Sequence, residues 1–231
     1  MQRLFPLPAG QVTVADAYGV ARSRVRSAGG AERPWVGLCM VASIDGSTVL
    51  DGASAGLSSS ADREVMLTVR TIADMIIVGA GTVRTEGYGP PRKPGQRIGV
   101  VSRSGTMDLT VPLFASGAGF LIMAEDSPDV DVESVRAGIG TVDLELALQR
   151  LPGSPTFVQA EGGASLNGAL AAAGVLDEIN ITTSPRVVGG DGARATTNAP
   201  ELHNRYRLAH LLEHDDFLFS RYVRDSADGR P

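Results

Sequence analysis

Hydrophobic and polar residues alternate along this chain in blocks that predict strands separated by helices and loops. The first core strand is predicted at residues 35–43, a continuous apolar run bounded by Pro34 and by the turn pair Asp45-Gly46. A second buried strand is predicted at residues 74–78, where a glycine-rich turn follows. Similar short apolar runs predict further strands at residues 97–101, 119–124, 155–159 and 178–183.

Helical patterns occupy several of the intervals between these strands. Ser59-Ser60-Ala61-Asp62 fits a capping box, in which a hydroxyl and a carboxylate satisfy the free amides of a first helical turn. The helix that it opens is predicted over residues 60–72, because apolar side chains recur there at helical spacing. Another helix is predicted over residues 143–151, and a third begins after the glycine-rich segment 161–165.

The two ends of the chain differ from this central pattern. Residues 1–33 are predicted to be a peripheral N-terminal extension, with a short helix from Thr13 to about Arg26. Residues 205–224 fit two strands joined at His214-Asp215-Asp216 in a hairpin. Alternating strands and helices closed by a hairpin predict one α/β domain over residues 34–231, built on a mixed, mostly parallel sheet with an antiparallel C-terminal hairpin.

Composition and charge narrow the classes of function. The 231 residues are 43% hydrophobic and 20% charged, which is enough apolar material for the core of one ordinary domain. The net charge is −5 and no run of lysine and arginine exceeds two residues. Binding to nucleic acid or to a membrane surface requires a concentrated basic face, so we expect neither partner.

The single cysteine and the absence of long apolar segments indicate the cellular compartment. Cys39 can form no internal disulfide, which suits a reducing environment. No apolar segment is long enough to span a bilayer, and the first residues lack the pattern of a signal peptide. We therefore expect a cytoplasmic protein.

One apparent metal motif does not fit the predicted elements. His210-Leu211-Leu212-Glu213-His214 matches the inverted zinc-protease pattern H-x-x-E-H. That pattern requires a helix, on which the two histidines share one face. On the strand predicted here the histidines would stand about 13 Å apart, at ~3.3 Å per residue, so we expect no metal site.

Two predicted strands end in glycine-rich loops, Gly79-Ala80-Gly81-Thr82 and Glu161-Gly162-Gly163-Ala164-Ser165. Glycine allows backbone amides to approach a ligand closely, and the start of a following helix adds partial positive charge. Each loop alone is more often only a tight turn. However, ligands of open α/β sheets collect at the carboxyl ends of the strands, where both loops are expected. Together they predict a dinucleotide site.

The strand that follows the first glycine loop indicates which dinucleotide to expect. It ends in Val101-Ser102-Arg103 and carries no acidic residue at its end to hold the ribose 2′-hydroxyl of NADH. A serine and an arginine at such a position suit a 2′-phosphate instead. The sequence therefore predicts NADPH, with Ser102 or Arg103 at its 2′-phosphate.

Three charged residues are candidates for the chemistry, and each also has a simpler explanation. Asp45 is either a turn residue or a group for binding or proton transfer at the end of the first core strand. Glu161 is either a local cap of the following helix or a ligand for a neutral or hydroxyl-bearing group, because a carboxylate is unsuited to face a phosphate. Arg70 is either a solvated helix residue or a ligand for a substrate phosphate.

Several segments in one order resemble the reductase domain of the bacterial riboflavin-pathway deaminase–reductase, a relative of dihydrofolate reductase. The resemblance covers roughly residues 34–224. The matching segments are Ser43-Ile44-Asp45-Gly46, Arg70, Gly79-Ala80-Gly81-Thr82-Val83-Arg84-Thr85-Glu86, Glu161-Gly162-Gly163-Ala164-Ser165-Leu166-Asn167, Leu176-Asp177-Glu178 and Ser184-Pro185-Arg186-Val187-Val188-Gly189-Gly190. The family implies a dihydrofolate-reductase-like sheet flanked by helices, usually in a homodimer. It also implies hydride transfer from NADPH to the ribosyl group of 5-amino-6-(5-phosphoribosylamino)uracil, which opens that sugar to a ribityl chain.

The glycine loops and this resemblance together assign expected roles to individual residues. The expected cofactor-binding residues are Ala42, Gly79, Gly81, Thr82, Glu86, Ser102, Arg103, Gly162, Gly163, Ala164, Ser165, Leu166 and Asn167. The expected substrate-binding residues are Ser54, Arg70 and Glu161. Asp45 and Glu161 are the carboxylates nominated for catalysis, either as proton donors or as groups that orient the substrate.

The chain also departs from the family pattern, mainly toward the substrate. A tryptophan common in the family is replaced by Gly56, and the usual P-x-L-x-x-R segment is replaced by Gly87-Tyr88-Gly89-Pro90-Pro91-Arg92-Lys93. With one cysteine and no P-C-x-x-C motif, the sequence contains no deaminase half. Two alternative functions stay open: reduction of a pteridine in the manner of dihydrofolate reductase, and a catalytically silent nucleotide-binding module.

Overall fold

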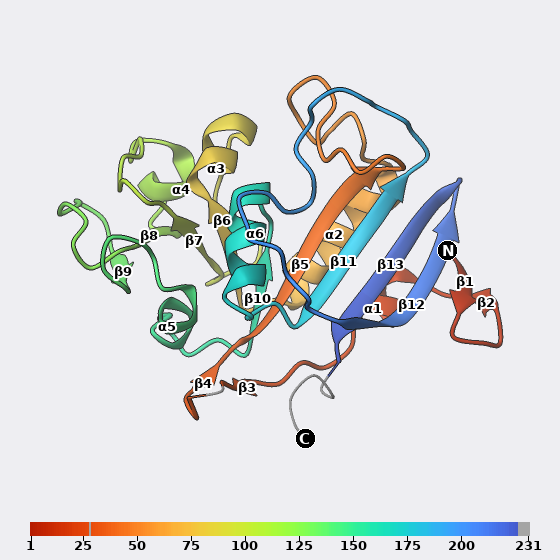
Figure 1. The fold of residues 1–231 in the computed structure, drawn as a ribbon, viewed down its shortest axis with the longest axis horizontal. Coiled ribbons are helices and arrows are strands. Elements are labelled where there is room, and N and C mark those ends of the chain that lie inside the picture. Colours follow the sequence, from red (N-terminus) through yellow and green to blue (C-terminus); the bar gives the residue numbers. More distant parts are fainter. Residues whose placement is uncertain (28, 226–231) are drawn as a thin grey trace.

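A single large sheet organises the computed structural model, which describes residues 1–27 and 29–225 (Figure 1). In the described residues its eleven strands follow the order β2-β1-β12-β13-β11-β5-β10-β6-β7-β8-β9. The strands are β1 (Gln2–Phe5), β2 (Gly10–Gln11), β5 (Trp35–Ser43), β6 (Met75–Gly79), β7 (Arg97–Val101), β8 (Gly119–Met123), β9 (Ser134–Arg136), β10 (Phe157–Ala160), β11 (Glu178–Ser184), β12 (Tyr206–His214) and β13 (Phe217–Arg224). A separate pair joins β3 (Val25–Arg26) to β4 (Glu32–Arg33).

Strand direction confirms the predicted fold class. The strands β11, β5, β10, β6, β7, β8 and β9 pair in parallel, whereas β13 pairs antiparallel with both β11 and β12. The mixed, mostly parallel sheet with an antiparallel C-terminal hairpin is therefore confirmed. The hairpin also places His210 and His214 on the strand β12, as predicted.

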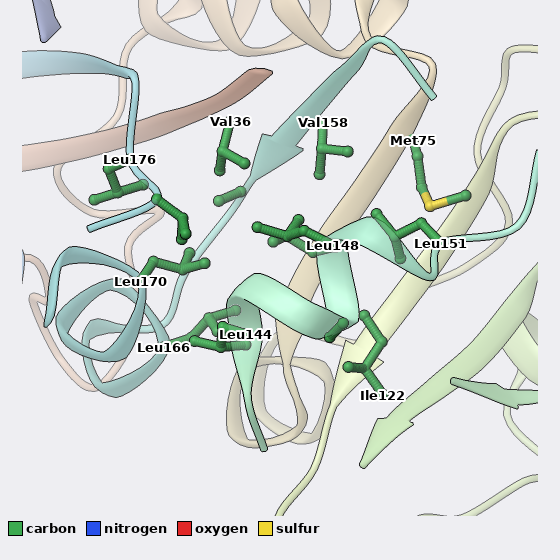
Figure 2. Packing of buried hydrophobic residues seen from close by; sticks show 14 of the residues in the cluster. Val36, Met75, Ile122, Leu144, Leu148, Leu151, Val158, Leu166, Leu170 and Leu176 are labelled. Carbon is green, nitrogen blue, oxygen red and sulfur yellow. The ribbon is translucent and has the colours of Figure 1, made fainter. Parts of the chain in front are cut away.

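Helices cover both faces of the sheet, because alternate side chains of its central strands point to opposite sides. The helices are α1 (Val14–Tyr18), α2 (Ser60–Ile72), α3 (Ala80–Glu86), α4 (Pro112–Ala115), α5 (Leu144–Gln149) and α6 (Ala164–Ala172). Met75 and Ile77 of β6 pack with α5 and α6 in one core, part of which Figure 2 shows. Ile76 and Val78, between them in sequence, pack with α3 and α4 in another core on the opposite face. A third core joins α1 and α2.

The predicted N-terminal helix was wrong beyond Tyr18. The helix α1 has only five residues, begins at a Thr13 cap and ends at Gly19. The chain leaves the helix there because Arg22 turns inward, where it binds the buried carboxylate of Glu178 through Nε and an NH₂ group, at 3.0 and 2.7 Å. A buried ion pair of this kind fixes the path of the chain more strongly than the weak helix propensity of a short segment.

Residues 1–33 make extensive contacts with the rest of the chain. The strand β1 pairs antiparallel with β12 at the edge of the sheet, and the side chains of Val14 and Tyr18 are buried. Arg33 forms a buried bidentate pair with Asp177, whose carboxylate also accepts a hydrogen bond from the amide of Val36. The division at residue 34 stays a prediction. In the part of the chain that the structure describes, no helix has the length and apolar character needed to cross a membrane.

Candidate active site

The two predicted glycine loops lie directly against each other. The strands β6 and β10 are parallel neighbours, and the hydrogen bonds continue past their ends, from the amide of Gly79 to the carbonyl of Gly162 at 2.7 Å. A Cβ atom on Gly163 would lie 2.8 Å from Oγ1 of Thr82, which is closer than such atoms approach. Gly162 has φ of +84°, a left-handed conformation that favours glycine. Glycine is therefore favoured at position 162 by its backbone conformation and at position 163 by the closeness of the Thr82 side chain.

A cavity of about 800 Å³ opens at this edge of the sheet. Its walls come from β5, the start of α2, α3, the residues after β10 and the first turn of α6, and loop residues 48–58, Ala193 and Thr197 also contribute. Ten of the predicted site residues line it: Ser54, Gly79, Gly81, Thr82, Glu86, Glu161, Gly163, Ala164, Ser165 and Leu166. The structure thus brings the two glycine loops and the predicted substrate side into one space.

Glu161 lies in this cavity at the centre of a cluster of polar side chains. Its Oε1 accepts hydrogen bonds from Nε of Arg70 at 2.8 Å and from Nε2 of Gln159 at 3.0 Å. Its Oε2 accepts from a second nitrogen of Arg70 and from the hydroxyl of Tyr88 at 2.9 Å. Four donors fill the acceptor positions of one carboxylate. Glu161 and Arg70, predicted as separate substrate ligands, therefore bind each other.

The electrostatics of this cluster follow from its partial burial. The side chain of Glu161 is only 5% exposed, and that of Arg70 is 25% exposed. Burial alone would lower the pKa of Arg70, but the hydrogen bonds and charge of Glu161 raise it above its ordinary value. Burial raises the pKa of Tyr88, and the nearby negative charge of Glu161 raises it further. Arg70 is thus fixed as a cation and Tyr88 as a neutral hydrogen-bond donor.

Asp45 lies outside the residues that line the cavity and holds two loops together. Its Oδ1 accepts from the hydroxyl of Ser43 at 2.6 Å and from the amide of Val188 at 3.1 Å, and its Oδ2 accepts from the amide of Gly189 at 2.7 Å. The hydrogen bond from Ser43, followed by those from the two amides, lowers the pKa of Asp45 from 3.8 to about 2. The predicted catalytic role of this carboxylate stays a prediction, while its contacts explain it as a loop clasp.

The remaining predicted cofactor residues are not among the described residues that line the cavity. Ala42 is buried in β5, and Gly162 directly precedes the lining residue Gly163 in the turn after β10. The amide of Asn167 donates to the carbonyl of Ala195 and to the sulfur of Met40. After β7, the buried hydroxyl of Ser102 accepts from the amide of Gly105 at 3.1 Å, and Arg103 is exposed. Their contacts with a cofactor stay predictions.

Sequence reasoning missed Tyr88 and Arg63, which line the cavity, and Gln159, which supports Glu161. Tyr88 was noted only as part of a departure from the family pattern, and Gln159 and Arg63 were not considered. Gln159 lies two residues before Glu161 on the buried strand β10, so its inward direction follows from the alternation of a strand. For Tyr88, a large polar aromatic between two glycines in a loop was the available signal.

Comparison with known proteins gives the same picture. The model of the RibD C-terminal domain family matches residues 34–216. A curated 2,5-diamino-6-ribosylamino-4(3H)-pyrimidinone 5′-phosphate reductase from Methanothermobacter thermautotrophicus is 28% identical over 181 residues, covering 70% of this chain and 82% of that protein.

Two solved structures establish the similarity of fold. A pyrimidine reductase-like protein from Corynebacterium diphtheriae superposes with a TM-score of 0.73 at 22% identity, covering 83% of this chain and 92% of that one. Dihydrofolate reductase from Enterococcus faecalis, solved in complex with NADP(H), superposes with a TM-score of 0.52 at 13% identity, covering 83% of this chain and 97% of that one. The predicted dihydrofolate-reductase-like architecture is confirmed.

The family match covers most of the chain, including both glycine loops and the cluster around Glu161. A nicotinamide cofactor is consistent with this family and with its fold. The predicted resemblance is confirmed: the chain belongs to the RibD C-terminal domain family, whose relatives are reductases of riboflavin biosynthesis.

Proposed function

We propose that this protein is an NADPH-dependent reductase that opens the ribosyl group of a phosphoribosylaminopyrimidine to a ribityl chain. The observation that carries the proposal is a cavity with two unlike walls. One wall consists of backbone, where the glycine loops after β6 and β10 meet. The other carries the polar side chains grouped around Glu161. A dinucleotide fits the first wall and a polar heterocycle fits the second.

The backbone wall has the room that a dinucleotide needs. A Cβ atom added to Gly81 would meet no other heavy atom within 4 Å, so this glycine faces open space beside Thr82. The first turn of α6, from Ala164 to Leu166, also lines the cavity and directs its free amides toward that end. These residues would hold the pyrophosphate and ribose groups, with Glu86 at the end of α3. When bound, NADPH supplies the hydride.

The side-chain wall orients the substrate and excludes water. Glu161 accepts from four donors, a pattern typical of a carboxylate that fixes its neighbours rather than of an acid that releases a proton. The hydroxyl of Tyr88 has its proton committed to Glu161, so its oxygen keeps acceptor capacity for an amine or hydroxyl of the substrate. Preorganised contacts of this kind hold the acceptor carbon in a reactive position.

A turnover assay tests the proposal directly. Purified protein is mixed with NADPH and with one of three substrates: the 2,5-diaminopyrimidinone form, the uracil form of the phosphoribosylaminopyrimidine, or dihydrofolate. We expect loss of the reduced-nicotinamide absorbance with a phosphoribosylaminopyrimidine and formation of its ribityl product. Consumption with dihydrofolate alone would favour the pteridine alternative, and cofactor binding without oxidation of any substrate would favour the silent module.

The preference for NADPH over NADH has its own test at Arg103. This exposed arginine directly follows β7 and Ser102, close to the end of the neighbouring strand β6. Arg103→Ala should weaken NADPH binding by roughly 1.5–3 kcal/mol, the range for a charged hydrogen bond, and leave NADH binding almost unchanged. Arg207→Ala, at an exposed position of β12 outside the cavity lining, is the matched control. Equal losses for both cofactors would place the 2′-phosphate elsewhere. A homodimer and a cytoplasmic location stay predictions.

A further inference from the structure

One basic residue of the cavity is left without a partner. Among the described residues that line the cavity, Arg63 is the only lysine or arginine. It is exposed, and no hydrogen bond or ion pair engages its side chain in the described part of the chain. Arg70, for which the sequence left open a role as ligand of a substrate phosphate, is bound to Glu161. We propose that Arg63 binds the 5′-phosphate of the substrate, an inference that rests on the proposed function.

The position of Arg63 on α2 suits an elongated substrate. Arg63 and Arg70 are seven residues apart, which is almost two full turns, so both project from the same face of the helix. They are separated by about 10 Å along the helix axis, at 1.5 Å per residue. Met66, between them, also lines the cavity. A heterocycle at the Arg70 end, joined through its sugar, can therefore direct a phosphate toward Arg63.

The other charges of the cavity restrict a phosphate to this place. The remaining charged residues of the lining are the carboxylates Asp62, Glu86 and Glu161. Asp62 accepts a hydrogen bond from Ser58, and Glu86 accepts one from Ser54 at 2.9 Å. These serine protons are thereby committed to carboxylates. A dianion entering this space meets repulsion near these groups and attraction at Arg63.

The 2′-phosphate of the cofactor is the other phosphate that could reach Arg63. The geometry favours the substrate, because α2 and α6 pack on opposite faces of the sheet. The first turn of α6, which lines the cavity, lies on the face of the sheet away from α2 (Figure 1). The two sources share the chemistry of a phosphate monoester, so the experiment is designed to separate them.

The decisive measurement compares a phosphorylated substrate with its dephosphorylated form. Arg63→Ala should raise KM for the phosphorylated substrate about 10–100-fold, the equivalent of losing a charged hydrogen bond. KM for the dephosphorylated substrate, and KM for NADPH, should stay unchanged. Arg63→Lys keeps the charge without the planar fork and should show a smaller rise. Arg207→Ala serves as the matched arginine control and should change none of these constants.

Three outcomes would overturn the inference. An equal rise for both substrate forms would show that Arg63 acts on the cavity in general. A rise in KM for NADPH but not for NADH would assign Arg63 to the cofactor 2′-phosphate. Unchanged constants throughout would remove it from binding altogether.

A binding measurement separates this inference from the proposed reaction. Ribose 5-phosphate, followed by calorimetry, should bind the unaltered protein more tightly than ribose does, and Arg63→Ala should abolish that difference. This result does not require turnover. If the unaltered protein shows no difference between the two sugars, the inference fails even when the reductase assay succeeds. If the difference is present but no pyrimidine is reduced, the proposed function fails and the phosphate site remains.

Discussion

The two walls of the cavity achieve rigidity in opposite ways. At the backbone wall, here also called the glycine wall, the amide of Gly79 donates directly to the carbonyl of Gly162. A side chain at Gly163 would come too close to Oγ1 of Thr82. At the side-chain wall, here also called the polar wall, side chains from α2, β10 and the loop after α3 are held by the hydrogen bonds that converge on Glu161. The wall formed by backbone is sensitive to an added methyl group at Gly163, whereas the wall formed by side chains is sensitive to the loss of a hydrogen-bond partner. We therefore expect mutations at the backbone wall to change NADPH affinity and mutations at the side-chain wall to change the kinetics with the pyrimidine.

The largest effect is expected where the polar wall loses its centre. Glu161→Ala leaves the mostly buried Arg70 and the hydroxyl of Tyr88 without their acceptor. Breaking a fully buried pair costs about 3–5 kcal/mol, and with Arg70 25% exposed we expect roughly 2–3 kcal/mol from the free energy of unfolding. kcat/KM for the pyrimidine should fall about 100-fold or more, while NADPH affinity changes little.

Glu161→Gln is the informative companion variant because it keeps the shape of the side chain. It replaces one accepting oxygen with a donor that faces Arg70 and either Tyr88 or Gln159, but it keeps the other oxygen as an acceptor for Arg70, so a smaller loss of stability is expected. Denaturant unfolding and steady-state kinetics measure both quantities. A loss of NADPH affinity equal to the loss for the pyrimidine would show that the two walls are not independent.

The next largest effect is expected at the glycine wall. Gly163→Ala places a methyl group 2.8 Å from Oγ1 of Thr82, and overpacking of this kind costs roughly 1–3 kcal/mol. The shift that relieves it should widen the cofactor side and lower NADPH affinity, measured by fluorescence titration. Gly81→Ala is the matched control for stability, because its methyl group would meet open space. It should leave unfolding unchanged and weaken only cofactor binding.

These two walls also differ in how far the sequence could predict them. Glycines are needed where backbones approach, so the wall after β6 and β10 was recognisable from the residue types alone. The pairing of Arg70 with Glu161 joins residues 91 positions apart, and no local pattern encodes which donor a buried carboxylate selects. The residue types of Arg70 and Glu161 indicated a polar site. Only the three-dimensional arrangement shows that the two side chains bind each other.

The same limit applies to the fold. The central strands were predicted because continuous apolar runs between turn residues are typical of a buried parallel sheet. The helix predicted through Arg26 failed because a long-range contact with Glu178 outweighed local preference. The short strand β9, with three residues, also carried too little pattern to be recognised.

A smaller effect is expected at Tyr88, which contributes one of the four donors to Glu161. Tyr88→Phe removes a single hydrogen bond of about 1 kcal/mol and leaves the ring beside Arg70. KM for the pyrimidine should rise about fivefold, with NADPH affinity and kcat nearly unchanged. The substrate analogue that lacks the contacted amine or hydroxyl should show no difference between the two proteins. A uniform rise for both compounds would mean that Tyr88 only supports Glu161.

The smallest effect is expected at Asp45, which distinguishes a loop clasp from a proton donor. Because its folded pKa is lowered from 3.8 to about 2, its stabilising contribution is present above pH ~4 and is lost as the pH falls toward 2. Asp45→Asn should weaken this acid dependence and raise KM modestly, since the clasped segment leads to Ala193 and Thr197 at the cavity. kcat should stay within about twofold across neutral pH, because an ionised carboxylate with so low a pKa supplies no proton there. A fall in kcat of several orders of magnitude, with the loops still resistant to proteolysis, would instead show that Asp45 takes part in the reaction. The polar wall would then include Asp45 in addition to the cluster around Glu161.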